Sequence, residues 1–225
     1  MTIQTQPSAK NVTLSLDDYL QLTALMFSWG DSYDSKDWDR LRTIIAPTLM
    51  IDYRRVMGDQ WYWEAMPAED YMRMVSDPGF LGDPLVKTQH LLGATKWEQL
   101  SETEVIGHHQ LRAAHNRFTD LTLQRVDRRG HGHATNEHFY KRINGTWKFA
   151  GLRPTVRWNE YDFEHIFKGI KFEDYAPKSD KGEIEKPSAC ATENGENEIN
   201  GAKKEMSHVN ELRSASNEKY LDFVV

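Results

Sequence analysis

The period of the apolar residues changes near Gly82, and this change restricts the possible fold more than any other feature of the sequence. Before Gly82, apolar residues recur every three or four positions, which is typical of helices that bury one face. After Gly82, apolar and polar residues alternate over long stretches, as they do in half-buried strands. Helices followed by long antiparallel strands predict an α+β fold in which a curved sheet packs against helices.

Three helices are expected in the first part of the chain. Ser15 suits an N-cap, so the first helix begins directly after it. The second spans about residues 37–45 and is stopped by Pro47, and the third spans about residues 67–76. The apolar stripe of the first helix comprises Leu16, Leu20, Thr23, Phe27 and Gly30, widened by Leu22, Leu25, Met26 and Trp29.

Strands dominate the rest of the domain, after a short strand at Leu49–Tyr53. The dipeptide Asn144-Gly145 favours a two-residue hairpin turn, and it leads into a final strand at Trp147–Gly151. Thr95 falls on the side of its strand opposite to His90. In each of three strands, alternate residues are expected to lie on one face. These residues are Val86, Thr88, His90, Leu92 and Ala94 in the first strand, Val105, Gly107, His109, Leu111, Ala113 and His115 in the second, and Gly132, Ala134, Asn136, His138 and Tyr140 in the third.

Composition divides the chain close to residue 172. All seven Trp lie at or before Trp158, and no aromatic residue occurs between Tyr175 and Tyr220. Residues 173–225 contain 12 acidic and 7 basic residues. Such a stretch cannot bury enough apolar surface to offset the entropy lost on ordering. We therefore expect a flexible segment at 1–12, one folded domain at 13–172 and a disordered acidic tail at 173–225.

The composition also excludes several classes of protein. A single Cys rules out a disulfide scaffold and a multi-cysteine zinc site. The net charge of −6 argues against a nucleic-acid groove, which needs concentrated basic residues. No apolar run approaches the ~20 residues that span a bilayer, and the first residues lack the layout of a secretory signal. We expect a soluble protein with a cytoplasmic or endosomal location and no nucleic-acid or membrane partner.

Five residues suggest acid–base chemistry. His90 and His115 each lie in a strand face that is otherwise small and apolar, where a lone histidine is more often a hydrogen-bonded core residue. Asp34, Tyr33 and Tyr53 shift this balance toward catalysis. A histidine with a pKa of about 6.5 exchanges protons at neutral pH, and a carboxylate on its second nitrogen fixes the tautomer. Phenolic hydroxyls can stabilise an enolate, so the set suits proton removal beside a carbonyl followed by loss of a leaving group.

A metal site is the competing interpretation for two other histidines. His131 and His133 share one side of a strand, and Glu137 follows four residues later. Such a spacing can supply metal ligands, but it is equally compatible with imidazoles on the outer face of a sheet. No third histidine stands at a diagnostic spacing. We therefore expect no metal at these histidines.

Residues 29–42, WGDSYDSKDWDRLR, resemble the first motif of the fungal scytalone dehydratases. The resemblance extends in order over about residues 13–170. It implies a cone-shaped α+β barrel of the nuclear-transport-factor-2 and ketosteroid-isomerase type, assembled as a homotrimer. The other matching segments are Ile45–Leu49, Ile51–Arg54, Trp63–Glu69, Leu81–Pro84, Thr88–His90, Glu104–Gly107, His109–Arg112, Trp147–Leu152 and Asp162–Phe163.

The resemblance implies a hydro-lyase that removes water from scytalone and vermelone in dihydroxynaphthalene melanin synthesis. The substrates are small aromatic ketones derived from polyketides, and no cofactor takes part. The resemblance assigns Tyr33 and Tyr53 to a water that contacts the substrate carbonyl. It makes His90 the base for the alpha proton, and it pairs His115 with Asp34 to help the hydroxyl leave.

Further positions that match the family imply a binding site around these groups. Asn136 would bind a substrate hydroxyl, and the aromatic ring would be covered by Phe163 and Phe167. Val56 and Met74 complete the expected substrate-binding residues.

Three departures from the family affect the shape of the binding site. Ala134 replaces a serine, Val56 stands where an aromatic residue is expected, and two extra residues occur near 59–62. The reaction type is therefore better specified than the substrate. A dehydratase or cyclase for another fungal polyketide remains an alternative, as does a non-catalytic binding module of the same fold. A binding module would not need the complete proton-transfer set.

Overall fold

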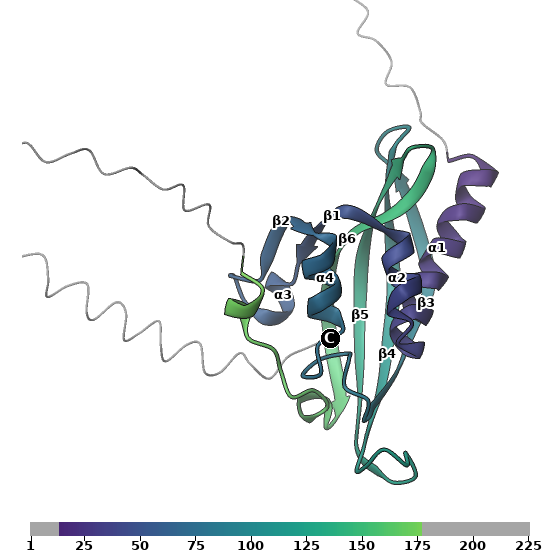
Figure 1. The fold of residues 1–225 in the computed structure, drawn as a ribbon. Coiled ribbons are helices and arrows are strands. Elements are labelled where there is room, and N and C mark those ends of the chain that lie inside the picture. The colour runs from purple at the N-terminus through teal and green to yellow at the C-terminus, as the bar shows by residue number, and fades with distance from the viewer. Residues whose placement is uncertain (1–13, 177–225) are drawn as a thin grey trace, which may run out of the picture.

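A single six-stranded sheet organises the protein, whose computed structural model describes residues 14–176. The strand order is β2-β1-β6-β5-β4-β3, and every neighbouring pair is antiparallel except β1 and β6. The four long strands curve together in Figure 1, and the expected α+β fold with a curved, mostly antiparallel sheet is confirmed. The strands are β1 (Ile45–Asp52), β2 (Tyr62–Pro67), β3 (Val86–Gln99), β4 (Glu104–Phe118), β5 (Val126–Ile143) and β6 (Thr146–Tyr161).

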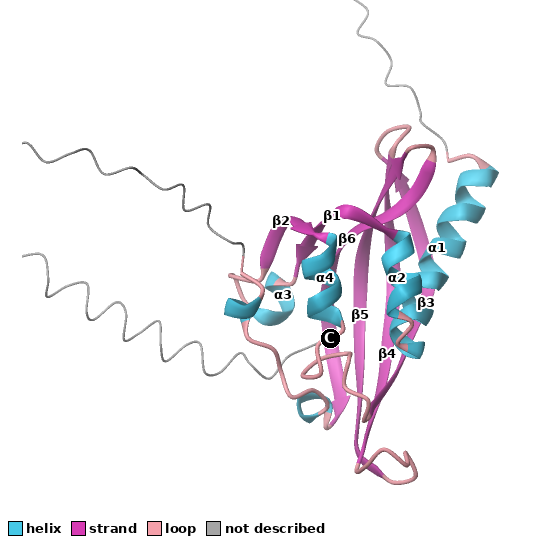
Figure 2. Cartoon of the chain, viewed as in Figure 1, coloured by secondary structure: helices cyan, strands magenta, loops and turns pink. Residues whose placement is uncertain are grey.

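Helices occupy the remaining chain, mostly before the long strands (Figure 2). The Ser15 hydroxyl caps α1 by accepting from the Asp18 amide, and the Asp37 carboxylate caps α2 by accepting from the Arg40 amide. The short elements α3 and β2 were not predicted, because four to six residues are too few to establish a period. The helices are α1 (Leu16–Ser35), α2 (Trp38–Ile44), α3 (Arg54–Met57) and α4 (Ala68–Val75), with 3-10 turns η1 (Phe163–His165) and η2 (Phe172–Asp174).

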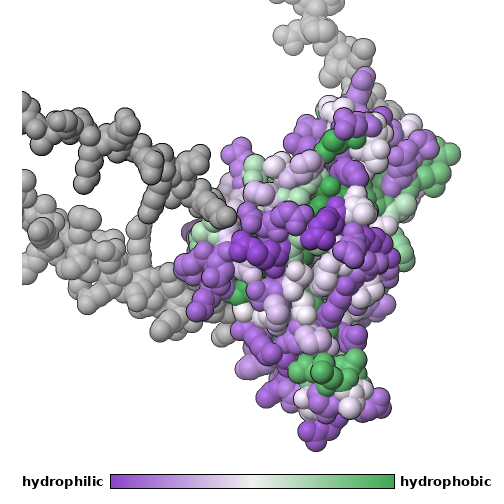
Figure 3. All heavy atoms as spheres, viewed as in Figure 1, coloured by the Kyte–Doolittle hydropathy of each residue, from purple (hydrophilic) through white to green (hydrophobic). Residues whose placement is uncertain are grey.

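The buried face of α1 is not the stripe predicted from the sequence. Leu16, Leu20 and Phe27 are 74%, 57% and 67% exposed, and apolar side chains gather over α1 at the upper right of Figure 3. The helix instead buries Leu22, Leu25 and Trp29, which were expected only to widen the stripe, and Gly30 is the one buried member of the stripe itself. Both faces are apolar, so period alone could not choose between them. The buried residues are Leu22, Leu25, Trp29, Gly30, Ser32 and Tyr33.

An irregularity in β3 changes which residues face the helices. The pairing of β3 with β4 shifts between Leu92 and Thr95, as in a β-bulge. As a result, Thr95 bonds to the inward-facing His109, whereas Ala94 is exposed. The strict alternation that placed Ala94 with His90 was therefore wrong beyond Leu92.

The inward faces of β4 and β5 agree with the prediction. His115 pairs with Gly130 across the two strands, and His109 pairs with Asn136. The predicted inward face of each strand is buried, from Val105 to His115 in β4 and from Gly132 to Tyr140 in β5. The hairpin at Asn144-Gly145 is confirmed, since both residues have positive φ, 50° and 79°, in a two-residue turn between β5 and β6.

The folded unit continues slightly past the expected boundary at residue 172. Tyr175 is 5% exposed, and its carbonyl accepts a hydrogen bond from the Trp63 indole at 2.9 Å. Its hydroxyl donates to Asp77 at 2.5 Å. The predicted flexible segment at 1–12 and nearly all of the predicted tail lie outside the described residues. Within residues 14–176, no helix is both long and apolar enough to cross a membrane.

Candidate active site

The last turn of α1 delivers two adjacent polar side chains to the interior. Tyr33 is buried among aromatic rings, and Asp34 reaches across to β3. The C-cap of the helix is Lys36, whose left-handed conformation (φ 58°) lets its amide donate to the Ser32 and Tyr33 carbonyls. The capped end of the helix therefore fixes the backbone positions of Tyr33 and Asp34.

Asp34 holds the ring and the backbone of His90. Its Oδ1 lies 2.7 Å from His90 Nδ1 and accepts from the Thr88 hydroxyl at 2.9 Å, while its Oδ2 accepts from the His90 amide at 2.8 Å. Burial alone would raise the pKa of Asp34, but the hydrogen bonds and charge of His90 outweigh burial and lower this pKa. An ionised Asp34 fixes the His90 proton on Nδ1 and leaves Nε2 free to accept one.

His115 is not the partner of Asp34, so the pairing implied by the family resemblance is wrong here. Asp34 contacts β3 at Thr88 and His90, whereas His115 lies one strand further away, opposite Thr88 on β4. Neither ring nitrogen of His115 has a hydrogen-bond partner among the described residues. Burial, and then the charge of His90, lower the pKa of His115 to about 3, so this ring is neutral at physiological pH.

The two imidazoles meet edge to face beside the C-terminal segment. The ring centroids of His90 and His115 are 6.2 Å apart at an interplanar angle of 88°. Phe163 and Phe167 approach His115 edge-on, at 5.4 and 5.2 Å. A Cβ at Gly130 would lie within 2.8 Å of the Phe163 amide nitrogen, so the glycine allows η1 to pack directly on β5.

Three tyrosine side chains lie together in the core beside these histidines. Tyr33 is 5.5 Å from the His90 ring, and its hydroxyl hydrogen-bonds to the hydroxyl of Tyr71 on α4. Tyr53 precedes α3 and is also buried. Burial raises the pKa of Tyr33 and Tyr53 well above 10 and that of Tyr71 to about 12. All three phenols are therefore neutral donors at physiological pH.

Tyr71 was not identified from the sequence. Its spacing from Met74 and Val75 along α4 is that of ordinary core residues, and all three are buried. Only the position of α4 relative to α1 brings its hydroxyl to Tyr33. No local pattern could have revealed that contact.

The expected substrate-binding residues lie in or beside the same core. Asn136 is 3% exposed on the inner face of β5, and its side-chain oxygen has no hydrogen-bond partner among the described residues. A buried amide oxygen without a partner is unusual and is suited to a ligand hydroxyl. Val56 and Met74 belong to the hydrophobic core that also contains Tyr33 and Tyr53.

A second group of buried polar side chains lies further along the sheet. The Thr95 hydroxyl is 2.9 Å from His109 Nδ1, and the Tyr140 hydroxyl lies 3.1 Å from His138 Nδ1 and 3.4 Å from His109 Nε2. Burial lowers the pKa of His109 to about 4 and that of His138 well below 6.5. These residues form a neutral polar group within the core.

His131 and His133 lie on the outer face of the sheet, opposite to His90 and His115. His133 stacks on Trp158 with centroids 4.4 Å apart, and its Nε2 lies 3.4 Å from Glu160. His131 meets the edge of Tyr161 at 5.3 Å. The described part of the chain brings no three metal-ligating side chains together, so the metal hypothesis lacks a third ligand there.

A curved sheet and the helices packed against it enclose a carboxylate-bound histidine, a neutral histidine and several phenols. This α+β fold with these side chains is typical of an enzyme that uses acid–base chemistry. Comparison with known sequences identifies the family. Residues 13–173 match the scytalone dehydratase family, and the chain belongs to it.

Two relatives match over most of their own length. The chain is 65% identical over 161 residues to scytalone dehydratase arp1 of Aspergillus fumigatus, a match that covers 72% of this chain and 95% of the relative. It is 54% identical over 159 residues to the scytalone dehydratase of Pyricularia oryzae, covering 71% and 91%.

Solved structures of low sequence identity share the fold. A Kribbella flavida protein, Kfla4162, superposes with a TM-score of 0.55 at 19% identity, covering 64% of this chain and 93% of that one. A hexachlorocyclohexane dehydrochlorinase, LinA-type3 from Novosphingobium barchaimii, gives a TM-score of 0.50 at 15% identity, covering 65% and 90%. At these identities the comparison supports the architecture alone.

Proposed function

We propose that this protein is a hydro-lyase that removes water from scytalone and from vermelone in dihydroxynaphthalene melanin synthesis. Family membership and the 65% identical relative that carries the name scytalone dehydratase support the substrate. The observation that carries the chemistry is the Asp34–His90 pair facing His115. The substrate class is a small aromatic ketone derived from a polyketide.

His90 is the base in this reaction. Its Nδ1 donates to Asp34, which leaves Nε2 to take the proton from the carbon next to the substrate carbonyl. The imidazolium that forms is stabilised by the ionised Asp34 carboxylate. A positioned base of this kind typically contributes about 10²–10⁴-fold to the rate.

The tyrosines stabilise the enolate. Loss of the alpha proton places negative charge on the carbonyl oxygen, where neutral hydroxyl donors are most effective. The phenols of Tyr33 and Tyr53 stay protonated because burial raises the pKa of each. They donate to the developing oxyanion directly or through one shared water.

The leaving hydroxyl receives its proton from His90. His115 is neutral, with a pKa of about 3, so it lacks the acidic imidazolium proton that a general acid would transfer to the leaving oxygen. The proton taken from carbon passes from the His90 imidazolium to the departing oxygen, the C–O bond breaks, and the enolate electrons form the new C=C bond. His115 donates a hydrogen bond to the departing oxygen. This assignment moves the acid role from His115, where the resemblance placed it, to His90.

The remaining residues bind the ring system. The unpartnered Asn136 oxygen accepts a hydrogen bond from a substrate hydroxyl, and Phe163 and Phe167 cover the ring above His115. Val56 and Met74 contribute apolar surface. Shielding the site from water strengthens each electrostatic contact within it.

A turnover assay tests this proposal. The purified protein is incubated with scytalone, vermelone and an unrelated polyketide ketone, and the naphthol products are separated by chromatography. Formation of the dehydrated naphthol from scytalone supports the function. Turnover of only the third compound would favour the alternative, a dehydratase or cyclase for another fungal polyketide, which Ala134 and Val56 leave open.

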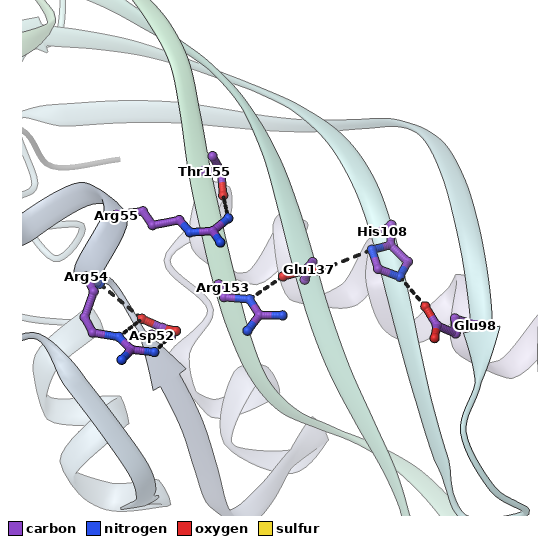
Figure 4. A network of polar contacts seen from close by, with 8 residues as sticks. All are labelled: Asp52, Arg54, Arg55, Glu98, His108, Glu137, Arg153 and Thr155. Carbon is purple, nitrogen blue, oxygen red and sulfur yellow. Dashed lines mark hydrogen bonds and ion pairs between the residues drawn. The ribbon is translucent and has the colours of Figure 1, made fainter.

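We also propose a homotrimer, as the family resemblance implies, and a cytoplasmic or endosomal location. The outer face of the sheet carries a row of polar contacts that links β3, β4, β5 and β6 (Figure 4). His108 lies 2.9 Å from Glu98 and 3.5 Å from Glu137, which also pairs with Arg153. We propose this face as the surface that contacts the other copies. Sedimentation analysis of the purified chain tests the trimer, and a monomer at micromolar concentration would refute it.

A further inference from the structure

We propose that Tyr71 is a positioning residue for the dehydration, because its hydroxyl sets the direction in which the Tyr33 hydroxyl donates. This inference rests on the proposed function. It concerns a residue that the sequence places among ordinary core positions. Tyr71 contacts Tyr33 and thus acts on the substrate through it.

The contact joins two helices that are far apart in the sequence. Tyr33 stands in the last turn of α1, and Tyr71 stands in the middle of α4. Their hydroxyls are hydrogen-bonded, and both side chains are almost wholly buried, with 2% and 0% exposure. The Tyr71 ring packs against Phe149, with centroids 6.3 Å apart. Packing therefore fixes the position of both rings, and the hydrogen bond joins the hydroxyl groups of the two tyrosines.

The direction of this hydrogen bond follows from the number of protons available. A phenol carries one donor and two acceptor positions. If Tyr33 donates to the substrate oxygen or to a shared water, its only proton is used there. Tyr71 must then donate to the Tyr33 oxygen. The order is Tyr71 to Tyr33 to the ligand, and a hydroxyl that accepts a hydrogen bond becomes a stronger donor.

A purely structural role would not require the hydroxyl. Phenylalanine would fill nearly the same volume against Phe149, and a buried hydroxyl is unfavourable unless it is bonded. The Tyr71 hydroxyl is bonded to Tyr33, which itself lies 5.5 Å from the His90 ring. Its location beside the proton-transfer groups distinguishes it from a core tyrosine.

A double-mutant cycle tests the proposal. Tyr71→Phe should lower kcat about tenfold with KM changed less than about twofold, because ground-state binding is retained while the donor to the enolate is less well oriented. In a Tyr33→Phe background, Tyr71→Phe should cause no further loss. A wild-type kcat in Tyr71→Phe, or an equal tenfold loss in both backgrounds, would overturn the positioning role.

Tyr140→Phe is the matched control. Tyr140 is also fully buried, and its hydroxyl bonds to His138, apart from the tyrosine group. This variant should lose stability while its kcat stays within about twofold of wild type. A kcat loss equal to that of Tyr71→Phe would show that any lost buried hydroxyl has this effect, which contradicts the proposal.

Proton NMR of the ligand-free protein separates this proposal from the proposed function. The hydrogen bond between the two phenols should give a slowly exchanging, downfield hydroxyl resonance that disappears in both Tyr33→Phe and Tyr71→Phe. Its absence from the wild-type spectrum would overturn the inference whatever the substrate. Failure to turn over scytalone with the resonance present would count against the function alone.

Discussion

Asp34 Oδ1 lies 2.7 Å from His90 Nδ1, and the same carboxylate also binds the backbone amide of His90. The neighbouring histidine, His115, has no partner of this kind among the described residues. One imidazole is thus able to carry charge, and the other is kept neutral by burial. This asymmetry assigns proton transfer to His90 and leads to the first two predictions.

Replacing Asp34 with asparagine should lower kcat by about 10²-fold or more, because an amide cannot stabilise the His90 imidazolium and favours a different tautomer. Steady-state kinetics with scytalone measure the change. Asp31→Asn is the control, since Asp31 lies on the same helix and pairs with Arg40 at the surface. Asp31→Asn should keep near-normal turnover. A near-normal kcat in Asp34→Asn would refute the role of the pair.

Removing the imidazole of His90 or of His115 should also lower the rate strongly. His90→Ala and His115→Ala are each expected to lower kcat at least about 100-fold, because one loses the base and the other loses the donor to the leaving oxygen. His165→Ala removes an exposed histidine and should turn over normally. Circular dichroism checks that each variant is folded. A folded His90→Ala protein with wild-type turnover would exclude His90 as the base.

Acidification should destabilise the protein through His115. Burial lowers its pKa to about 3, whereas its ordinary value, reached in the unfolded chain, is 6.5. As the pH falls, the imidazole of His115 takes up a proton in the unfolded chain before it does so in the folded protein. The free energy of unfolding is therefore not reduced by this group above pH 6.5, and it decreases as the pH falls from 6.5 toward 3. In this window His115 should reduce the free energy of unfolding by up to about 1.4 kcal/mol per pH unit. Denaturant titrations at pH 7, 6 and 5 measure the slope.

An exposed histidine, His165, provides the control for this prediction. His115→Gln should flatten the dependence of stability on pH by about the amount that one histidine contributes. His165→Gln, with a side chain that is 61% exposed, should leave the dependence unchanged. Identical slopes in the wild type and in His115→Gln would mean that His115 titrates alike in the folded and unfolded states.

The long strands were the most predictable part of the fold. Alternation along β4 and β5 placed His115, His109 and Asn136 on the buried face, because neighbouring antiparallel strands keep a regular register. The same reasoning failed for Ala94 and Thr95, where a bulge reverses the faces of β3. A bulge leaves no reliable mark in the local period.

The site was predictable in its members but less so in its contacts. The sequence identified Asp34, His90 and His115 as a proton-transfer set, yet their pairing depends on which strand the end of α1 meets. Tyr71 reaches Tyr33 only through the packing of α4, and α1 carries apolar residues on two faces. Such tertiary choices are set by the whole core, so they cannot be read from one element.

Adding a methyl group at Gly130 should disturb the cover of the site. A Cβ there would lie within 2.8 Å of the Phe163 amide nitrogen and closer still to its Cα, so η1 must move away from β5. Gly130→Ala should raise KM for scytalone about tenfold and lower stability by about 1–3 kcal/mol. Gly93→Ala is the control, because its nearest neighbour would be at an ordinary 3.6 Å. An unchanged KM in Gly130→Ala would show that Phe163 does not cover the ligand.

Truncation at two positions should separate the folded unit from the predicted tail. Removing residues 177–225 should leave the melting temperature and kcat close to wild type, because the composition of that segment predicts no contribution to the core.

Removing residues 171–225 also deletes Tyr175, which accepts from the Trp63 indole and donates to Asp77. It deletes Phe172 as well, whose ring packs 5.3 Å from that of Trp61. The shorter protein should therefore lose several kcal/mol of stability through exposed aromatic surface. Thermal unfolding of both truncations, followed by Trp fluorescence, checks this, and equal stability of the two would show that residues 171–176 contribute nothing.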